Sequence, residues 1–472
     1  MATSIKKFYI ELYEEYLDDA SALYEAMLTL YEDAEISWLD IADWEARYEP
    51  YIAGLSVGND LALDVCNKKA HDGDFGELHA AVRVFCRQNR PDMLLALLGK
   101  DFDYEDGEKV KAVLDALKYE MPDNWLSGLL PVLASGHQPL VGILAAVFGY
   151  RRLPATMQLL NALSTASSEG KTAILTALGR LQGHLHGYLQ GYLQGNEASD
   201  VVYQHLSLQN AMLQMAALNA LLRMGDQRAV SYIAANALRY PSLWIKAAQC
   251  GDRSLHDRLI EHASHSALNA EQIVALGIIG DIRAIQTIPH YLTDPDTATA
   301  AAHALFLITG AALYETVFIS DAVDTDVLFE EELKKYQETG ELPKNADGQP
   351  MGENIRRLSQ NPDDWRQWWQ KHARRFTIEQ RFRLGQLYSP KALINTLTSE
   401  STPAKIRQCV YEELVIRYGL KVAFEYDMRV SEQLKRIADM EAWNEKHHRR
   451  FDMEQYYFCG LPSNKGEALP VF

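Results

Sequence analysis

The sequence predicts an all-α protein, an α-solenoid of helix-turn-helix repeats with helical caps at its N- and C-terminal ends. Six glycines between residues 149 and 310 lie 30, 46, 26, 29 and 30 residues apart, and such a period is typical of stacked helical repeats. Runs rich in Ala and Leu, such as residues 216–222, precede most of these glycines. The pair Gly-Asp occurs at three of them and indicates a tight turn between two helices.

Each position of the Gly-Asp turn has a physical role. Glycine adopts the left-handed backbone conformation that ends a helix without a steric clash, and the following Asp can accept N–H bonds at the start of the next helix. We expect the Arg two residues later to reach the carboxylate of a neighbouring turn, which would form a ladder along the stack. The predicted turn residues are Gly225, Asp226, Arg228, Gly251, Asp252, Gly280, Asp281 and Arg283. The alternative is an irregular helical bundle in which the glycines only end helices.

Composition and charge exclude several classes of function. The chain has 472 residues and a net charge of −18, which argues against general binding to nucleic acid or to anionic membranes. Its five cysteines are scattered and form no Cys-x-x-Cys pair, as expected in a reducing compartment. The sequence offers no run of 18 apolar residues. We therefore expect a cytoplasmic protein that does not span a membrane.

Residues 1–120 are predicted to form an N-terminal helical region. Apolar residues recur at helical spacing in residues 5–33, as one helix or two. Thirteen Asp and Glu stand against a single Arg between residues 11 and 49. We interpret these acids as a solvated helix face, with a docking surface as the alternative, and the aromatic residues that follow as core.

Residues 121–318 contain the predicted repeat array, which has an insertion near residues 183–196. Gly-Tyr-Leu-Gln occurs there twice in tandem, and so many glycines disfavour a helix interior. An exposed loop with two tyrosines suits a protein interface, so the candidate partner-binding residues are Tyr188, Leu189, Tyr192 and Leu193. A replicated insertion without a role explains the repeat equally well.

The rest of the chain is predicted to form three further regions. Residues 319–355 are a polar excursion or linker around one charged helix, because Asp, Gly and Pro are frequent there. Residues 356–445 form a helical cap, in which Trp365, Trp368 and Trp369 share one helix face and anchor a final layer. Residues 446–472 are a tail that folds back on the surface or frays.

No motif in the sequence indicates chemistry. His262 and His265 lie one turn apart, but the order of acid and histidines differs from a zinc-protease helix and no third ligand is evident. Residues 72–74 resemble the start of a calcium loop whose closing acid is missing. Phosphate-binding loops, nucleophile elbows and dinucleotide fingerprints do not occur. We therefore predict no catalytic residue, no cofactor and no metal, and a binding scaffold rather than an enzyme.

Three stretches, taken in order, resemble an uncharacterised family of HEAT-like proteins that are encoded in type VI secretion loci. They are SWLDIADWEARYEPYIAGL (residues 37–55), GDFGELHAA (residues 73–81), and residues 363–390 with DDWRQWW, RFRLG and YSP. The resemblance implies a bacterial toxin-delivery setting and brings no catalytic residues. Combined with the repeats, it predicts a protein-binding scaffold that uses its concave face. The expected partner is an effector or spike component, with the chain as adaptor. The alternatives are an immunity protein against a cognate toxin and an enzyme on a helical scaffold.

Overall fold

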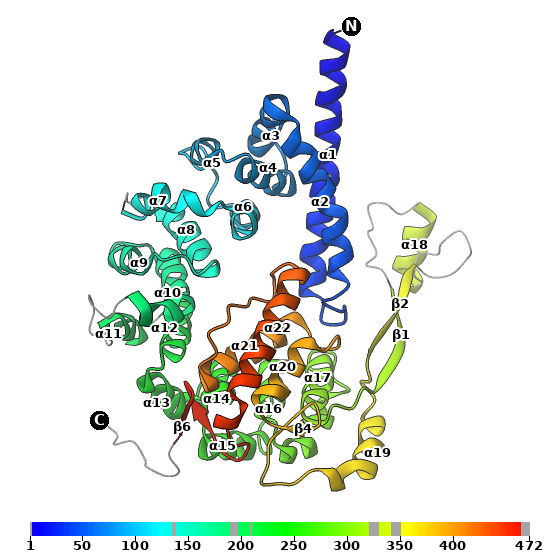
Figure 1. The fold of residues 1–472 in the computed structure, drawn as a ribbon. Helices are drawn as coiled ribbons and strands as arrows, with labels where there is room; N and C mark the ends of the chain where they lie inside the picture. Colours follow the sequence, from blue (N-terminus) through cyan, green and yellow to red (C-terminus); the bar gives the residue numbers. More distant parts are fainter. Residues whose placement is uncertain are drawn as a thin grey trace. The chain divides into compact units, whose positions relative to one another are not determined.

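A computed structural model describes residues 2–134, 138–188, 197–207, 210–320, 330–340 and 351–463. The chain divides into two compact units, one of Met1–Leu259 with Ser389–Phe472 and one of Ile260–Tyr388. Both units consist of helices with a few short strands (Figure 1), which confirms the predicted all-α class. These limits differ from the five predicted regions, because the C-terminal helices after residue 389 pack with the first unit.

The first unit begins with six helices that pack around α4. They are α1 (Ala2–Glu32), α2 (Ile41–Val57), α3 (Asn59–Asp72), α4 (Phe75–Arg87), α5 (Pro91–Leu97) and α6 (Gly107–Glu120). Helix α4 contacts α1, α3 and α6, and each of its residues from Gly76 to Cys86 is buried. The N-terminal residues form one long helix, α1, rather than two.

The predicted array follows as a succession of helices. They are α7 (Leu126–Leu129), α8 (Gln138–Tyr150), α9 (Thr156–Leu163), α10 (Ser168–Tyr188), α11 (Glu197–Tyr203), α12 (Ala211–Met224), α13 (Gln227–Asn236), α14 (Trp244–Cys250) and α15 (Arg253–Ala263). Helix α10 packs between α8 and α12 (Figure 1). Short 3-10 turns join several of them, at Asp123–Trp125, Leu130–Ala134, Gln204–Ser207 and Pro241–Leu243.

Two of the recurring glycines do not make turns. Gly149 is the next-to-last residue of α8 and Gly179 lies inside α10, and neither adopts the left-handed conformation that was predicted to end a helix. A Cβ at Gly149 would lie 2.5 Å from the Cα of Ala177, and one at Gly179 would lie 2.8 Å from the Cα of Ala220. Glycine recurs here because the helix axes approach too closely for a side chain.

The Gly-Asp turns follow the prediction at two of three positions. Gly225 and Gly280 end their helices in the left-handed conformation, each with φ 76°. Gly251 instead has an extended backbone, with φ −63° and ψ 152°, which corrects the prediction of a left-handed turn there. The carboxylate of Asp252 still accepts the N–H of Leu255, 2.9 Å away, at the start of α15, so the cap forms without that conformation.

The arginines of two Gly-Asp turns bind the aspartate of their own turn. Arg228 binds the Asp226 carboxylate at 2.6 Å, and Arg283 binds Asp281 in the same way. Arg228 also reaches the preceding segment, through Asp200 at 2.7 Å.

The second unit is built on α16 (Ala270–Ile279) and α17 (Ala298–Thr309), which pack together and are joined by 3-10 turns. The predicted polar excursion departs from two strands that the sequence analysis missed, β1 (Tyr314–Ser320) and β2 (Gly352–Leu358), which pair antiparallel. Helix α18 (Glu330–Thr339) lies between them in sequence. It is the predicted charged helix.

Helix α19 (Pro362–His372) closes the second unit, followed by the short strands β3 (Phe382–Arg383) and β4 (Gln386–Leu387). Trp365 is buried and its indole N–H donates to the carbonyl of Ser359 at 2.7 Å. Trp368 is half-buried and stacks on His372. These tryptophans anchor the helix, as predicted.

The C-terminal part of the first unit contains α20 (Pro390–Thr398), α21 (Ala404–Tyr418), α22 (Val430–His447) and the paired strands β5 (Tyr457–Phe458) and β6 (Leu461–Pro462). Helix α21 packs on α14, α20 and β5. The predicted tail folds back up to residue 463. The backbone N–H of Cys459 donates to the carbonyl of Ile416, and that of Gly460 to Arg417.

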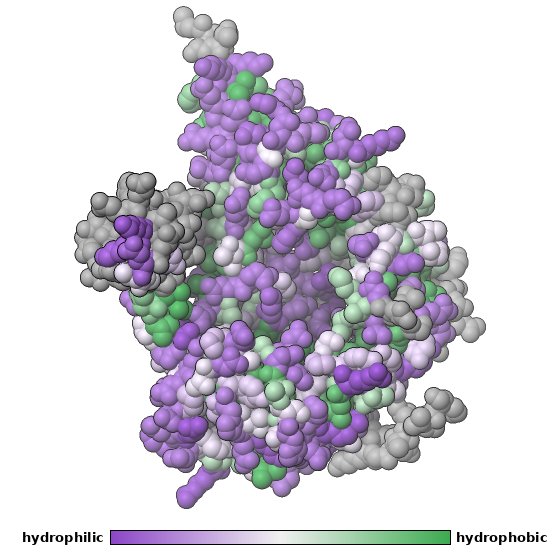
Figure 2. Space-filling view, turned by 180° about the vertical axis from the view of Figure 1, so that it is seen from behind, coloured by the Kyte–Doolittle hydropathy of each residue, from purple (hydrophilic) through white to green (hydrophobic). Residues whose placement is uncertain are grey.

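Hydrophilic residues cover most of the face shown in Figure 2, with hydrophobic residues in small groups between them. Among the helices of the described residues, none has both the length and the apolar character that a bilayer crossing needs.

Candidate functional site: a tyrosine-lined pocket and a row of paired cations

A pocket of about 440 Å³ opens in the first unit among α1, α2, α4, α6 and the segment before α22. Its size is that of a site for a small molecule or a few residues of peptide. The apolar lining includes Met27, Leu28, Ala42 and Ala46. The polar lining consists of Tyr24, Tyr31, Tyr48, Tyr119, Tyr426, Glu32, Glu45, Glu49, Asp115, Asp427, Arg83, Lys111, Arg429, His79 and Ser431.

Helix α4 is positioned by its N-terminal cap. The Asp74 carboxylate accepts the N–H of Glu77 at 2.7 Å, and the Glu77 carboxylate accepts the N–H of Asp74 at 3.0 Å. This reciprocal capping box fixes where the helix begins. Ser21 of α1 donates to Asp74 at 2.7 Å, so α1 holds the cap. His79 and Arg83, one turn apart on α4, consequently face the pocket.

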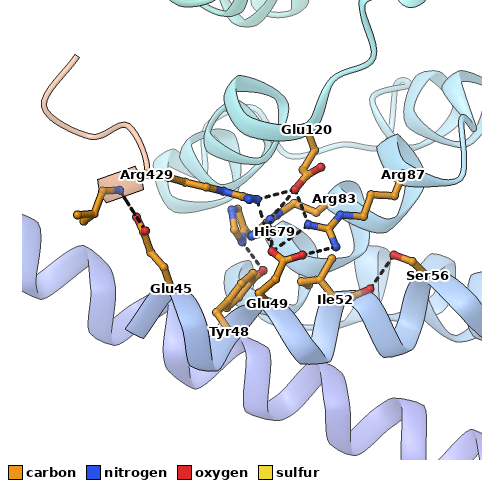
Figure 3. Close-up of polar contacts among 11 residues, drawn as sticks. Glu45, Tyr48, Glu49, Ile52, Ser56, His79, Arg83, Arg87, Glu120 and Arg429 are labelled. Atoms are coloured by element: carbon orange, nitrogen blue, oxygen red, sulfur yellow. Dashed lines mark hydrogen bonds and ion pairs between the residues drawn. The ribbon is translucent and has the colours of Figure 1, made fainter. Parts of the chain in front are cut away.

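One wall of the pocket is a network of charges (Figure 3). Arg83 binds Glu120 at 2.5 Å and Glu49 at 3.3 Å. Arg87 and Arg429 each bind Glu120 at 2.7 Å. Burial opposes ionisation of Glu120, but Arg87 and Arg83 outweigh it and lower its pKa to about 2. The carboxylates are therefore ionised and the network is fully charged at neutral pH.

His79 lies at the base of the pocket between two tyrosines. Its Nδ1 is 2.9 Å from the Tyr48 hydroxyl, and its ring stacks on Tyr24 with the centroids 3.8 Å apart. Tyr24 in turn donates to Asp115 at 3.0 Å. Burial, reinforced by the charge of Arg83, holds the pKa of His79 well below its usual range. The imidazole is therefore neutral and carries one proton.

The Arg83 guanidinium lies over the Tyr48 ring, 4.9 Å from its centroid. Nε2 of His79 is buried and has no hydrogen-bond partner among the described residues. The same holds for Nε of Arg83. His79 is 2% exposed and Arg83 is 4% exposed, and a buried donor without an acceptor costs about 1–3 kcal/mol.

Glu45 is the third unpaired group of the pocket. It accepts the N–H of Val430 at 3.1 Å through both carboxylate oxygens and the Tyr31 hydroxyl at 3.4 Å. Burial raises its pKa. Among the described residues, no cation lies within ion-pair distance of Glu45. Each of the other four carboxylates of the lining forms an ion pair with a lysine or an arginine. They are Glu32, Glu49, Asp115 and Asp427.

A second cluster of buried charge lies farther along the same unit. Four cations, which we call the cation row, are Arg152 just after α8, Arg180 on α10, Arg223 on α12 and Lys246 on α14. Two glutamates from the C-terminal part of the unit bind them. Glu425 meets Arg152 at 2.6 Å and Arg180 at 2.8 Å, while Glu412 of α21 meets Lys246 at 2.5 Å and Arg223 at 3.6 Å.

Each cation of the row is paired with a glutamate, and the Glu425 end of the cluster is the most deeply buried. The Glu425 side chain is 2% exposed. Its pKa is lowered, because Arg180 and Arg152 outweigh the burial that opposes ionisation. The pKa of Glu412 is lowered to about 2, since Lys246 and Arg223 outweigh the same effect of burial. The chain thus covers this surface of its own array with residues 404–429.

Of the four predicted partner-binding residues, the structure describes the backbone of Tyr188. Tyr188 is the last residue of α10, so helix α10 extends into the insertion that was predicted to be a loop. Leu189, Tyr192 and Leu193 lie outside the described residues. The pocket residues Tyr48 and His79 lie within the stretches that carry the family resemblance, but the sequence analysis assigned Tyr48 to the core and gave His79 no role. A histidine and an arginine one turn apart in an otherwise apolar helix were the signal that could have identified them.

His262, at the end of α15, and His265 belong to no metal site. Within the described ranges, no group of three or more His, Cys, Asp and Glu side chains could hold a metal ion.

Comparison with known proteins provides no family. No protein family matches the sequence, and no curated protein matches it. Among solved structures, an engineered protein is similar at 16% sequence identity over 64% of this chain and 84% of its own. The TM-score of that superposition is 0.22, which is too low to support any argument about fold or function.

Proposed function

We propose that the chain is a non-enzymatic α-solenoid of HEAT-like helix pairs that binds a protein partner in the cytoplasm of a bacterium. In this proposal it acts in type VI secretion as an accessory or adaptor for an effector or a spike component. The type VI setting rests on the resemblance of residues 37–55, 73–81 and 363–390 to proteins encoded in such loci.

The cation row is the observation that carries the binding role. Arg152, Arg180, Arg223 and Lys246 come from successive parts of the helical array, and Glu412 of α21 and Glu425 of the segment after it bind them. Repeat scaffolds bind polypeptides through such periodic surfaces. Because the chain's own residues 404–429 cover this surface, we place the external partner at the open pocket instead.

The experiment is affinity capture of the tagged full-length chain from a bacterium with a type VI secretion locus, analysed by mass spectrometry. A strain without the protein is tested for secretion of each captured effector. Capture of a spike component or of an effector's delivery region, with loss of secretion, is the expected result.

Two other results would overturn the adaptor role. Capture of an effector through its toxic domain, with secretion intact, would identify an immunity protein. Capture of no secretion component would contradict the type VI setting. A variant that lacks residues 187–195 is the matched control, since loss of the partner there would place the contact at the tandem insertion and not at the pocket.

A further inference from the structure

One stretch of the sequence occurs twice in the chain. Residues 368–387 and residues 443–462 share nine of 20 residues when the two stretches are aligned. The shared pairs are Trp368/Trp443, Lys371/Lys446, His372/His447, Arg374/Arg449, Arg375/Arg450, Phe376/Phe451, Glu379/Glu454, Gln380/Gln455 and Gly385/Gly460. The first copy belongs to the second unit and the second copy to the first unit.

The two copies fold alike. Each begins near the end of a helix, α19 or α22, where a tryptophan stacks on the histidine one turn later. The ring centroids of Trp368 and His372 are 4.3 Å apart, and those of Trp443 and His447 are 5.3 Å apart. A short 3-10 helix and a two-stranded hairpin follow in both copies, β3 with β4 and β5 with β6.

The hairpin of each copy closes with the same turn. Leu384 and Gly385 have φ values of 49° and 70°, and Cys459 and Gly460 have φ values of 48° and 79°. In both copies the two N–H groups of the turn donate to consecutive carbonyls in the last turn of a helix that ends at a left-handed glycine, α17 in the first copy and α21 in the second. The repeated sequence is therefore a repeated structural module.

The copies agree on their exposed cations. We call the segment Lys-His-x-Arg-Arg the basic motif; its lysine and two arginines are exposed in both copies. These six cations are Lys371, Arg374, Arg375, Lys446, Arg449 and Arg450. Among the described residues, none of the six has a carboxylate within ion-pair distance.

The buried positions of the module differ more than these exposed cations do. Arg383, which is 0% exposed, corresponds to Phe458, which is 4% exposed. Exposed cations at a helix end stabilise it only slightly, through the helix dipole, and most surface substitutions change stability little. Agreement at three exposed cations, beside disagreement in the core, points to a role on the solvent side.

We propose that the two basic motifs are docking sites for acidic stretches of the protein partner. This inference rests on the proposed function of binding a protein, and it adds contacts outside the pocket. The arginine forks bind carboxylates of aspartate or glutamate through paired N–H groups, and the lysine adds a third positive charge.

The charge of the chain favours an acidic polypeptide over nucleic acid. The net charge is −18, but at physiological salt charges interact over about 8 Å only, so three neighbouring cations attract an acidic stretch locally. Double-stranded DNA carries one charge per about 1.7 Å of its length and would extend beyond three cations over the acidic remainder of the chain. That remainder also repels an acidic peptide elsewhere, which directs it to the motifs.

The first basic motif is expected to bind more tightly than the second. Residues 365–378, which contain the first motif, include no Asp or Glu. The second motif is flanked by the exposed acids Glu445 and Asp452, which weaken its attraction for a carboxylate.

Fluorescence anisotropy on the intact protein tests the proposal at physiological salt. The probe is a fluorescein-labelled peptide of six Glu-Ser repeats, and its control is the same peptide with Gln in place of Glu. We expect the Gln peptide to bind about tenfold or more weakly, because it lacks the charges that the motifs recognise.

Charge reversal assigns the binding to the motifs. The variant with Arg374→Glu, Arg375→Glu, Arg449→Glu and Arg450→Glu should weaken the Glu peptide by about tenfold or more. Reversal of one motif alone should remove part of the association constant, more for the first motif than for the second. The two losses should add up to the whole, since independent sites contribute additively.

Two matched variants separate docking from a structural role. Lys6→Glu with Lys7→Glu, both exposed on α1, changes the charge as much as reversal of one motif and should leave binding nearly unchanged. Arg374→Lys with Arg375→Lys keeps the charge and should retain most of the binding to the first motif. If the cations serve only the helix ends, their reversal lowers the thermal stability and leaves peptide binding as it was.

Four results would overturn the proposal. They are no binding of the Glu peptide at millimolar concentration, normal binding by the variant with both motifs reversed, an equal loss in the variant of residues 6 and 7, and tighter binding of a labelled twelve-nucleotide single-stranded DNA than of the Glu peptide. The last result would identify a nucleic-acid surface instead.

The docking sites and the secretion role can fail separately. If affinity capture recovers a type VI partner but the Glu peptide does not bind, the docking proposal alone is wrong. If the Glu peptide binds through the motifs and no secretion component is captured, the docking sites remain and the proposed role is wrong.

Discussion

The two charged clusters of the first unit differ in how completely their groups are paired. In the cation row, Glu412 and Glu425 bind all four cations at 3.6 Å or less. In the pocket, a paired network stands beside two buried nitrogens without a hydrogen-bond partner among the described residues, Nε2 of His79 and Nε of Arg83. Glu45 accepts hydrogen bonds from Val430 and Tyr31 but has no cation within ion-pair distance there.

This difference separates a structural charge cluster from one suited to a ligand. A buried ion pair offsets the cost of removing both charges from water only if its geometry satisfies both partners. The cation row meets that condition within the chain, so nothing from outside is required. The pocket meets it only in part, because Glu45 has no cation within ion-pair distance among the described residues and two buried nitrogens have no hydrogen-bond partner there.

The largest expected effect is the loss of Glu425. Glu425→Leu leaves Arg152 and Arg180 without a counter-charge, and we expect the free energy of unfolding to fall by about 3–5 kcal/mol, measured by urea denaturation. Asp439→Asn, whose exposed carboxylate pairs with Arg436 at 3.6 Å, is the control and should cost less than about 1 kcal/mol.

A double variant sharpens this prediction. Adding Arg152→Leu to Glu425→Leu replaces the pair by apolar groups and should recover a large part of the lost stability, while Arg180, 22% exposed, can still reach water. If the double variant is no more stable than Glu425→Leu, then the unpaired charge of Arg152 is not the cause of the lost stability.

The second prediction concerns pH. The pKa of Glu412 is lowered to about 2 in the folded protein, against about 4.3 for an unfolded glutamate. Its stabilisation is therefore fully present above about pH 5 and is lost as the pH falls toward 2, by on the order of 3 kcal/mol. Glu412→Gln should be less stable at pH 7 and should lose less stability between pH 5 and pH 2. Equal losses in both proteins would contradict the assigned pairing.

A smaller effect is expected for the paired wall of the pocket. Glu120→Gln removes one of two carboxylates from Arg83 and Arg87, but Glu49 stays close to both. We expect a loss of about 1–3 kcal/mol, less than for Glu425→Leu, in the same urea experiment. If Glu120→Gln lost more stability than Glu425→Leu, the pocket network would stabilise the fold more than the cation row does, contrary to this prediction.

The sequence revealed the local parts of this architecture. The Gly-Asp phrase identified the turns at Gly225 and Gly280, because a left-handed glycine and a capping carboxylate act within a few residues. The spacing of the glycines alone grouped them with Gly149 and Gly179, which no Asp follows and where glycine serves a close approach to alanines on another helix. The sequence alone does not show whether a glycine is needed for a left-handed turn or for close packing against another helix.

The charge clusters were hidden for a different reason. Arg180 and its partner Glu425 are 245 residues apart, and the cations of the row stand at unequal offsets from the recurring glycines. Glu45 likewise meets Val430 across 385 residues. Its acidic neighbours made a solvated helix face the simplest interpretation. Pairing across such distances depends on packing that no local pattern encodes.

The smallest effect on stability is expected for substitution of Glu45, the carboxylate of the pocket that forms no ion pair among the described residues. Burial raises the pKa of Glu45, so the folded protein favours its protonated form, and the ionised form opposes folding once the pH rises through that pKa. Glu45→Gln imitates the protonated state and should change the free energy of unfolding at pH 7 by no more than about 0.5 kcal/mol. Thermal and urea unfolding measure this change, with Glu120→Gln as the paired counterpart. A loss as large as that of Glu120→Gln would show that Glu45 has a structural partner, and the distinction between the two clusters would no longer hold.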